Sequence, residues 1–328
     1  MPTPQRTMHA VLIRRFGGPE VVEFAEIPVP EPRAGEVLVK VEAASLNPVD
    51  WKIRGGNYPL VKDDKLPYVL GRDFSGTVEH SDDAALPAGT LVHGLLGIER
   101  GSFAQYVLAR AGELARVPGA IDRIAAAAVP LAGLTAWQGL FDHGGLRAGQ
   151  RVLIHAGAGG VGHFAVQFAK ARGATVIATV STGDVALARS LGADEAIDYK
   201  RDRFESRLGG IDLVFDLVGG ETQERSWAVL RKGGTLVSTV QEPAQDKAAA
   251  IDVRATRYAA TSDAGQLREI DALIQAGKVR PLVARTFAYG DAMVALRSLE
   301  EGHGAGKLVL DMAGVIANLP DPIYKPGD

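Results

Sequence analysis

A run of apolar residues leads directly into a glycine-rich turn at Val152-Leu153-Ile154-His155-Ala156-Gly157-Ala158-Gly159-Gly160-Val161-Gly162. The amphipathic run Phe164–Lys170 follows, so the chain is expected to pass from a strand through a turn into a helix. We expect Gly157 to make the tight turn, Gly159 to let the backbone approach a pyrophosphate, and Gly162 to let the helix pack closely on the strand. Amides at a helix N-terminus attract phosphate charge. A bare glycine pattern is often only a loop, but with these flanking elements it favours a dinucleotide site.

Strands and helices alternate from this point onward. We expect strands at Val152–His155, Thr175–Val180, Leu213–Asp216 and Thr235–Thr239, and helices at Val161–Arg172, Val185–Leu191 and Ala264–Ala276. This alternation predicts a parallel, doubly wound sheet with helices on its faces.

The sequence before the turn has a different texture. From Met8 to about Val117 it is rich in valine and in short alternating runs, which indicates a β-rich domain. Ile124 to Leu140 is typical of a helix, with Pro130 either early in it or at a break. We expect the closing strand Lys307–Leu310 to return to the first domain. The predicted class is therefore α/β, with residues 1–123 and 286–328 in the β-rich domain and 124–285 in the nucleotide-binding domain.

Composition limits the chemistry and the partners. The 328 residues are 46% apolar and 23% charged, which is ordinary for a folded chain of about two domains. A net charge of -3 and the lack of a basic–aromatic patch argue against nucleic acid or an anionic membrane as partner. The absence of cysteine rules out disulfides, thiolate catalysis and cysteine-ligated metals, so redox chemistry requires an organic cofactor. No segment approaches the roughly 20 apolar residues of a membrane span, and we expect a cytoplasmic protein.

The end of the second predicted strand bears on which cofactor is used. Enzymes that prefer NAD place an acid there to bind the ribose diol, whereas this chain has Thr179, Ser181 and Thr182. Hydroxyls and amides accept a 2′-phosphate that an acid would repel, so we expect NADPH as cofactor. The same residues also fit a simpler role as a cap of the next helix, and Asp184 lies close enough to oppose a phosphate.

Several motifs, in this order along the chain, resemble the medium-chain dehydrogenase/reductase superfamily. They are Ala43–Asp50 (AASLNPVD), Pro67–Gly76 (PYVLGRDFSG), Leu131–Trp137 (LAGLTAW), the glycine turn itself, and Ser190–Asp194 (SLGAD). The resemblance covers about Met8 to Asp311, nearly the whole chain. It implies a GroES-like catalytic domain with a Rossmann domain inserted before its last elements, and a homodimer.

The resemblance narrows to a branch without zinc. Where zinc-dependent alcohol dehydrogenases of this superfamily hold their catalytic metal, this chain has Asn47, Arg72 and about Leu131. These residues make no tetrahedral ligand set, and the cysteines of the family's structural zinc loop are absent too. We therefore expect no bound metal and similarity to the zeta-crystallin-like quinone and enone reductases.

In those relatives a hydride passes from the nicotinamide to a conjugated acceptor, and positioning supplies much of the catalysis. The resemblance places Asn47 where it can donate to a substrate carbonyl, and Tyr58 beside the substrate as a donor or proton relay. Asn47 also fits a purely structural role before Pro48, and Tyr58 fits ordinary loop packing. Asp50 and Lys52 are weaker candidates for the same region.

The resemblance also assigns a set of cofactor contacts. Thr135, Ser238 and Thr239 are expected near the nicotinamide and its ribose, Val218 beside the adenine, and Tyr199 near the adenosine phosphate. Lys307 resembles a family position close to the cofactor, although a lysine facing solvent is an equally good interpretation.

Three functions remain open at this level. The first is an NADPH-dependent reductase of quinones or other activated carbonyl or alkene substrates. The second is an alkenal or enoyl reductase, which shares the cofactor but prefers acyclic enones. The third is a protein that binds NADPH without catalysis.

Overall fold

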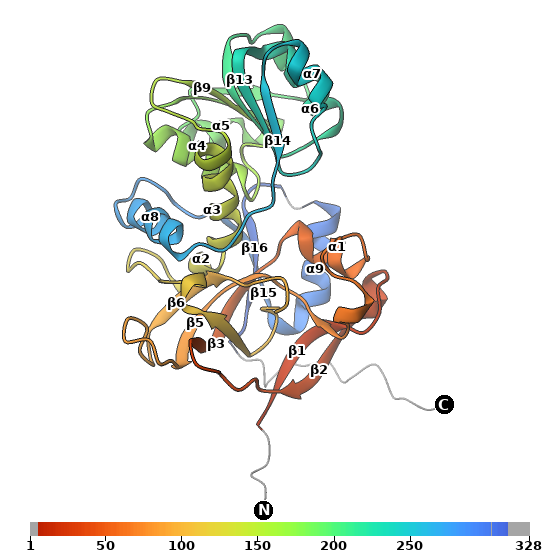
Figure 1. Cartoon of the computed structure of the whole chain (residues 1–328), viewed down its shortest axis with the longest axis vertical. Coiled ribbons are helices and arrows are strands. Elements are labelled where there is room, and N and C mark those ends of the chain that lie inside the picture. The colour runs from red at the N-terminus through yellow and green to blue at the C-terminus, as the bar shows by residue number, and fades with distance from the viewer. Residues whose placement is uncertain (1–5, 303, 314–328) are drawn as a thin grey trace, which may run out of the picture.

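The computed structural model describes residues 6–302 and 304–313, which form two sheet-based domains stacked along the long axis of the molecule (Figure 1). The strands are β1 (Thr7–Ile13), β2 (Val22–Pro28), β3 (Glu36–Ser45), β4 (Tyr68–Val69), β5 (Asp73–His80), β6 (Leu91–Leu95), β7 (Tyr106–Arg110), β8 (Leu114–Arg116), β9 (Arg151–Ile154), β10 (Thr175–Val180), β11 (Glu195–Asp198), β12 (Ile211–Asp216), β13 (Leu230–Ser238), β14 (Arg254–Arg257), β15 (Val283–Ala288) and β16 (Lys307–Asp311). The α-helices are α1 (Pro48–Arg54), α2 (Arg123–Ala127), α3 (Pro130–Trp137), α4 (Gly162–Ala171), α5 (Val185–Ser190), α6 (Gly220–Ser226), α7 (Gln245–Ala250), α8 (Ala264–Gln275) and α9 (Ala292–Glu301).

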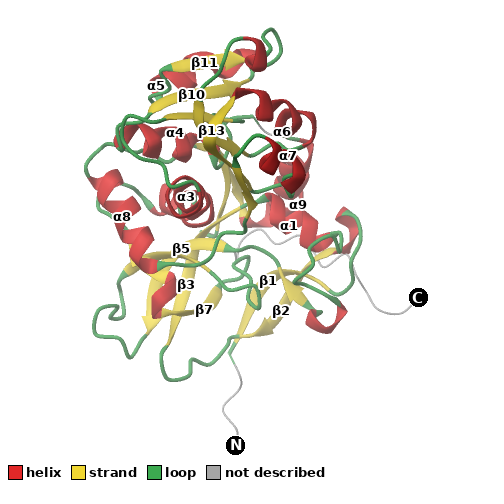
Figure 2. Ribbon diagram, turned by 45° about the horizontal axis from the view of Figure 1, so that its top comes forward, coloured by secondary structure: helices red, strands yellow, loops and turns green. Residues whose placement is uncertain are grey.

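The doubly wound domain is built on the six-stranded sheet, in the order β11-β10-β9-β12-β13-β14. Every neighbouring pair in it is parallel, as the strand–helix alternation predicted. Helices α3 and α4 lie on one side of this sheet and α6 and α7 on the other (Figure 2). The order reverses direction beside β9, and ligands of such sheets bind at the carboxyl ends of the strands at that point.

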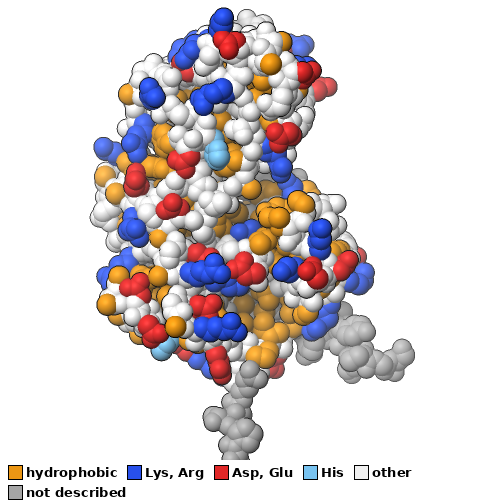
Figure 3. All heavy atoms as spheres, in the orientation of Figure 1, with side chains coloured by type: hydrophobic (Ala, Val, Ile, Leu, Met, Phe, Trp, Pro, Cys, Tyr) orange, Lys and Arg blue, Asp and Glu red, His pale blue; other side chains and the backbone are white. Residues whose placement is uncertain are grey.

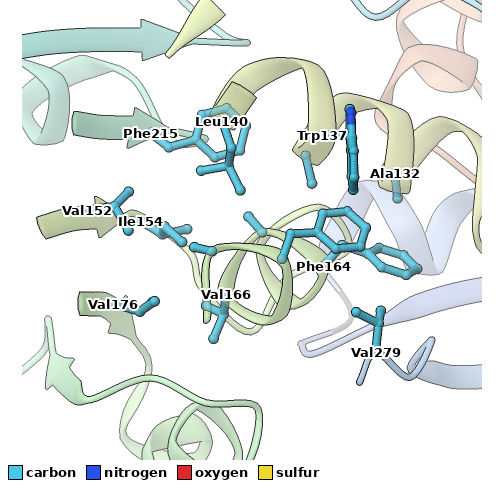
Figure 4. Packing of buried hydrophobic residues seen from close by; sticks show 14 of the residues in the cluster. Ala132, Trp137, Leu140, Val152, Ile154, Phe164, Val166, Val176, Phe215 and Val279 are labelled. Atoms are coloured by element: carbon cyan, nitrogen blue, oxygen red, sulfur yellow. The ribbon is translucent and has the colours of Figure 1, made fainter. Parts of the chain in front are cut away.

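Strand β9 is apolar from Val152 to Ile154 because both of its faces are covered there. Val152 and Ile154 pack into the cluster that includes Phe164 of α4, shown in Figure 4. Leu153 points to the opposite face, into a second buried cluster. Each such side chain contributes roughly 1.5–3 kcal/mol on burial, so this core fixes the strand from which the glycine turn leaves.

The β-rich domain is built on the seven-stranded sheet, in the order β15-β16-β3-β5-β6-β8, with β7 also paired to β3. Strand β16 runs antiparallel to β3, with Val309 opposite Ser45, so the prediction that the closing strand returns to the first domain is confirmed. A three-stranded sheet, β2-β1-β4, completes this domain.

The region around Pro130 is divided into separate helices. Helix α2 ends at Ala127, α3 starts at Pro130, and a π-helical turn continues it over Gln138–His143. The break at proline is therefore the correct alternative, because proline cannot continue a hydrogen-bonded helix from the preceding turn. The expected domain boundary at residue 286 falls inside β15, which pairs with β16 from Val283 onward.

The two domains meet at a notch in the molecular surface, bordered by hydrophobic side chains (Figure 3). At their junction the amide of Gly306 donates to the carbonyl of Ala158 in the glycine turn, 3.0 Å away. The segment that leads into β16 is therefore held against the turn. Within the described residues, no helix has the length and apolarity needed to cross a bilayer.

Candidate functional site

The glycine turn connects β9 to α4, and its conformation depends on the absence of side chains at two positions. A Cβ on Gly162 would lie 2.0 Å from the carbonyl oxygen of Ala156, and one on Gly157 would lie 2.6 Å from the Cβ of Ala178 in β10. The residue with left-handed backbone is Ala156, at φ 53°. Gly157 lies inside the turn that the Gly159 amide closes on Ala156 O, directly after this left-handed residue, and it must be small because β10 passes beside it.

The turn presents free amides for an anion. Gly157 donates to Thr179 O, and Gly159 donates to Ala156 O, 2.9 Å away. The amides of Gly160 and Val161 donate to no protein oxygen among the described residues. Two unpaired amides at the start of a ten-residue helix fit a dinucleotide pyrophosphate.

Thr179, expected at the 2′-phosphate, is buried and bonded to His155. Ser226 Oγ donates to Thr222 O, so it can only accept from His155 Nε2, 2.9 Å away. The other ring nitrogen, Nδ1, must then accept the hydroxyl hydrogen of Thr179 at 3.0 Å. Complete burial lowers the pKa of His155 to about 4, which keeps the ring neutral. The hydroxyl hydrogen of Thr179 is thus unavailable to a phosphate, and the expected role of this side chain needs correction.

The remaining residues at this strand end are more accessible. The hydroxyl of Ser181 donates to the carboxylate of Asp184, so the acid does reach back to the strand end. Thr182 is exposed, and Tyr199 is 57% exposed with its amide bonded to Val180 O at 3.1 Å. The structure brings Ser181, Thr182 and Tyr199 to one edge of the sheet, next to an acid.

Asp216, at the end of β12, organises the loops that hold three other expected residues. Its buried carboxylate accepts from the amide of Val218 at 3.0 Å and from the hydroxyl of Ser238 at 2.9 Å. Its backbone carbonyl accepts from the amide of Thr239 at 3.2 Å. The role of Asp216 was not predicted from the sequence. An acidic residue at the end of an apolar strand does indicate a buried carboxylate, and a buried carboxylate needs hydrogen-bond donors around it.

Thr135 lies in α3 and is almost fully buried. Its hydroxyl donates to Leu131 O at 2.6 Å within the helix, and its carbonyl accepts from the hydroxyl of Tyr258. The helix therefore uses the hydroxyl hydrogen of Thr135, and only the oxygen lone pairs remain for a ligand.

Asn47 precedes α1 and is 4% exposed. Its amide nitrogen donates to Asp73 Oδ1 at 2.8 Å and to Ser45 O at 3.2 Å. Its amide oxygen accepts from the ammonium of Lys307. Both amide hydrogens are committed to the protein, so donation to a substrate carbonyl would require one of these bonds to break.

Asp73, in β5, lies at the centre of a polar cluster that also contains Ser45, Asn47 and Lys307. Its role was not predicted from the sequence. Beyond Asn47, its carboxylate accepts from Ser45 Oγ at 2.9 Å and from the amide of Leu131 at 3.0 Å. Asn47 and Leu131, two of the residues that the resemblance aligns with zinc ligands, are both bonded to Asp73. Arg72, at the third position, donates to Leu96 O at 2.7 Å.

Lys307 is buried, which decides against the alternative of a solvent-facing lysine. Its ammonium donates to Leu46 O at 2.8 Å as well as to Asn47. A Cβ on Gly160 would lie 3.1 Å from the Cδ of Lys307, so this side chain runs along the glycine turn into the polar cluster. Burial lowers the pKa of Lys307, while the carboxylates of Asp73 and Asp50 oppose that shift.

Asp50 lies fully buried in α1, and its carboxylate accepts from the amide of Asn47 at 2.7 Å. Its second oxygen has no partner among the described residues. Burial raises the pKa of Asp50 to about 7, with the charge of Lys307 acting in the opposite direction. The side chain of Lys52 is only partly buried, and no contact places it in the cluster.

Tyr58 follows α1 and packs, partly buried, against the core of the β-rich domain. Its hydroxyl has no hydrogen-bond partner within residues 6–302 and 304–313, so it remains free to bind a ligand. Across that same part of the chain, no group of three or more histidine or acidic side chains is placed to hold a metal.

Known proteins match this chain over nearly its full length. The family described as alcohol dehydrogenase GroES-like domain matches residues 33–119, and the one described as zinc-binding dehydrogenase matches residues 191–310. An NADPH-dependent alkenal/one oxidoreductase of Arabidopsis thaliana is 36% identical over 93% of this chain and 80% of its own length.

Solved structures agree with these matches. The quinone oxidoreductase from Coxiella burnetii is 36% identical, has a TM-score of 0.87, and is matched over 94% of this chain and 100% of its own. A mycobacterial protein solved as a complex with NADPH is 32% identical, with a TM-score of 0.83 and coverage of 92% and 99%. The chain is an oxidoreductase of the NAD(P)H-dependent kind, and it belongs to the quinone oxidoreductase-like family of the medium-chain dehydrogenase/reductase superfamily.

Proposed function

We propose that this enzyme uses NADPH to reduce quinones or conjugated enones and enals, without a bound metal. The observation that carries the proposal is the contact between the glycine turn and the polar cluster through Gly306 and Lys307. This contact supports a phosphate site at the glycine turn next to a polar cluster that would bind a carbonyl substrate. The bound nicotinamide supplies a hydride, and positioning it against a conjugated carbon supplies much of the catalysis.

Most of the candidate residues have a proposed place in this complex. The amides of Gly160 and Val161, with Gly157, Gly159 and Gly162 shaping the turn, hold the pyrophosphate. Thr135, Ser238 and Thr239 lie toward the nicotinamide, and Val218 and Tyr199 toward the adenosine. Asn47 and Tyr58 lie on the substrate side, with Asn47 acting through the groups it holds. We also propose a homodimer, which the family resemblance supports and light scattering after gel filtration would test.

The test is steady-state turnover with NADPH and NADH against quinones, cyclic enones, acyclic enals and, in the reverse direction, simple alcohols with NADP+. We expect reduction of quinones or enones, no alcohol oxidation, and activity unchanged by dialysis against a strong chelator. Zinc bound at one per chain, or activity lost to chelator and restored by zinc, would overturn metal independence.

The same panel separates the rival functions. A clear preference for acyclic enals would identify an alkenal reductase, as the name of the Arabidopsis relative suggests. NADPH binding without turnover of any acceptor would indicate the non-catalytic alternative and end the proposal.

We propose a preference for NADPH of about ten- to a hundredfold in kcat/KM, because no acid ends β10 itself. Asp184, bonded to Ser181, limits this preference by its charge. We predict that Asp184→Asn raises the NADPH-to-NADH ratio by about two- to tenfold, since it removes a charge that repels the 2′-phosphate at a partly exposed site.

The measurement is kcat/KM for both cofactors at fixed ionic strength. Asp246→Asn, an exposed acid in α7, serves as the matched control and should leave the ratio unchanged. A wild-type enzyme that uses the two cofactors equally, or an Asp184→Asn variant with a lower ratio, would contradict this interpretation of the strand end.

A further inference from the structure

Lys307 is the residue that joins the glycine turn to the polar cluster. Its backbone amide donates to Leu282 O at 2.8 Å, its aliphatic chain passes Gly160, and its ammonium reaches Leu46 O and Asn47. A buried ammonium is costly unless it is paired, and here Asp73 and Asp50 act on it electrostatically. These two carboxylates favour the ammonium form of Lys307 beside the glycine turn, and they oppose the effect of its burial.

The ammonium has one donor left. A lysine ammonium carries three N–H groups, and two of those of Lys307 are used by Leu46 O and Asn47 Oδ1. Among the described residues no third acceptor contacts it. Asn47, by contrast, has donated both of its amide hydrogens. Of these two side chains, only Lys307 retains a donor for a ligand.

The position of this ammonium suits it to stabilise negative charge that develops on a bound substrate. Asp73 accepts from Asn47 Nδ2 and from the amide of Leu131, and the ammonium of Lys307 donates to Asn47 Oδ1. A fixed cation in a site shielded from water stabilises developing negative charge more strongly than the same cation in water.

We propose that the ammonium of Lys307 is the electrophilic group of this reductase, donating its third N–H to the carbonyl oxygen of the bound quinone or enone. This inference rests on the proposed function, and it names the group that stabilises the negative charge developing on the substrate oxygen. Lys307 thus becomes a catalytic residue, while Asn47 and Asp73 are positioning residues that hold the ammonium in place.

The step balances without a further reactant. The reduced nicotinamide cofactor provides the hydride, which forms a C–H bond at the electrophilic carbon of the acceptor. The π electron pair of the acceptor moves through the conjugated system to its carbonyl oxygen, which becomes an oxyanion. A proton on Nζ of Lys307 transfers to that oxygen, giving an enol from an enone or the keto tautomer of the hydroquinone from a quinone. Proton exchange with water then converts the enol to the saturated ketone, or the keto tautomer to the hydroquinone, and water returns a proton to the amine.

The test replaces Lys307 by methionine, which has a similar length and no charge. We expect Lys307→Met to lower kcat/KM by about 100- to 1,000-fold, the usual effect of removing one donor to a developing oxyanion. NADPH affinity, measured by fluorescence titration, should stay within about threefold, because the amides of the glycine turn are untouched. Lys40→Met, which removes an exposed lysine from β3, is the matched control and should behave as wild type.

A second measurement does not depend on turnover. 4-Nitrophenol mimics the product oxyanion, and its ionised form absorbs visible light. We expect it to ionise at a pH at least about one unit lower when bound to the wild type than when bound to Lys307→Met, because only the wild type supplies the ammonium. Lys307→Gln, which retains a neutral donor, should give an intermediate value and carries the test if the methionine variant does not fold.

The outcomes distinguish this inference from the proposed function. If the wild type reduces quinones or enones but folded Lys307→Met retains its kcat/KM, the role of Lys307 is wrong and the function stands. If the wild type reduces no acceptor, the function fails, and the nitrophenol shift still decides whether Lys307 stabilises an oxyanion. Equal ionisation in the wild type and in Lys307→Met would overturn the inference by itself.

Discussion

Gly162 and Ala156 are in direct contact across the glycine turn, and each has a backbone constraint of its own. Ala156 adopts a left-handed conformation that costs a residue with a Cβ roughly 1–2 kcal/mol. Gly162 is tolerated there because it has no side chain. The turn is thus a strained element that the buried strand β9 and helix α4 hold in place, and its residues are not interchangeable.

We predict that Gly162→Ala destabilises the protein by about 1–3 kcal/mol and weakens NADPH binding at least about tenfold, because the new methyl group would overlap the carbonyl of Ala156. Urea unfolding and fluorescence titration measure the two effects. Gly112→Ala is the control, since a Cβ there meets nothing within 4 Å and should change stability by less than about 0.5 kcal/mol. If the two variants behave alike, the turn is more adaptable than its contacts indicate.

Elements of the two domains are connected through the first turn of α4. His163 Nε2 accepts from the amide of Leu282, just before β15, at 3.1 Å. Its Nδ1 must therefore carry the ring hydrogen, which it donates to Gly159 O at 3.0 Å. Burial lowers the pKa of His163 to about 4, so the ring is neutral at physiological pH. The glycine turn and the return segment are thus joined by one neutral imidazole.

This arrangement predicts a dependence of stability on pH. The unfolded state binds a proton at His163 near the ordinary pKa of about 6.5, whereas the native state does so only near 4. Stability conferred by the neutral ring is therefore lost as the pH falls from about 6.5 to 4, by about 1.4 kcal/mol per pH unit for one proton. His155 has the same sign, while Asp50, with its pKa raised to about 7, has the opposite sign and gains stability as the pH falls.

We predict that His163→Leu reduces the slope of unfolding free energy against pH by about one proton between pH 6 and 4.5. Urea unfolding at half-unit pH intervals gives this slope, and comparison with the wild type cancels the contributions of all other groups. His80→Leu, an exposed histidine at the end of β5, should leave the slope unchanged. An equal slope in His163→Leu would mean that the native ring protonates like an exposed one.

At the scale of the whole molecule, a buried pair connects the two domains through β6 and α8. His93 lies in β6 of the β-rich sheet, and Asp271 lies in α8, which packs into the core of the doubly wound domain. The ring of His93 contacts Asp271 Oδ2 at 3.0 Å through Nε2 and Ala126 O at 3.1 Å through Nδ1. Both partners are acceptors when Asp271 is ionised, so the two bonds form together only if the ring carries two N–H groups.

We predict that Asp271→Ala destabilises the protein by about 3–5 kcal/mol, because it leaves a buried ring without its partner. Asp271→Asn should cost much less, since the asparagine amide can donate to a neutral ring. Thermal and urea unfolding of both variants test this, with Glu269→Ala on the exposed side of α8 as control, expected within about 1 kcal/mol of the wild type. A larger loss in Asp271→Asn than in Asp271→Ala would rule out the pairing described.

The sequence by itself determined several strands and helices of the doubly wound domain and the glycine turn between β9 and α4, because these follow from local periodicity and from residues adjacent in the chain. The strand Thr175–Val180 and the glycine turn both lie where the pattern predicted them. The family motifs added that Asn47 and Lys307 belong near the site. Tertiary structure alone decided the hydrogen-bond partners: Thr179 bonds to His155, and Lys307 meets Asn47 from 260 positions away in the chain. Such pairs depend on how β16 aligns with β3 and how the turn packs against Gly306, and no local pattern encodes the direction of a side chain across those contacts.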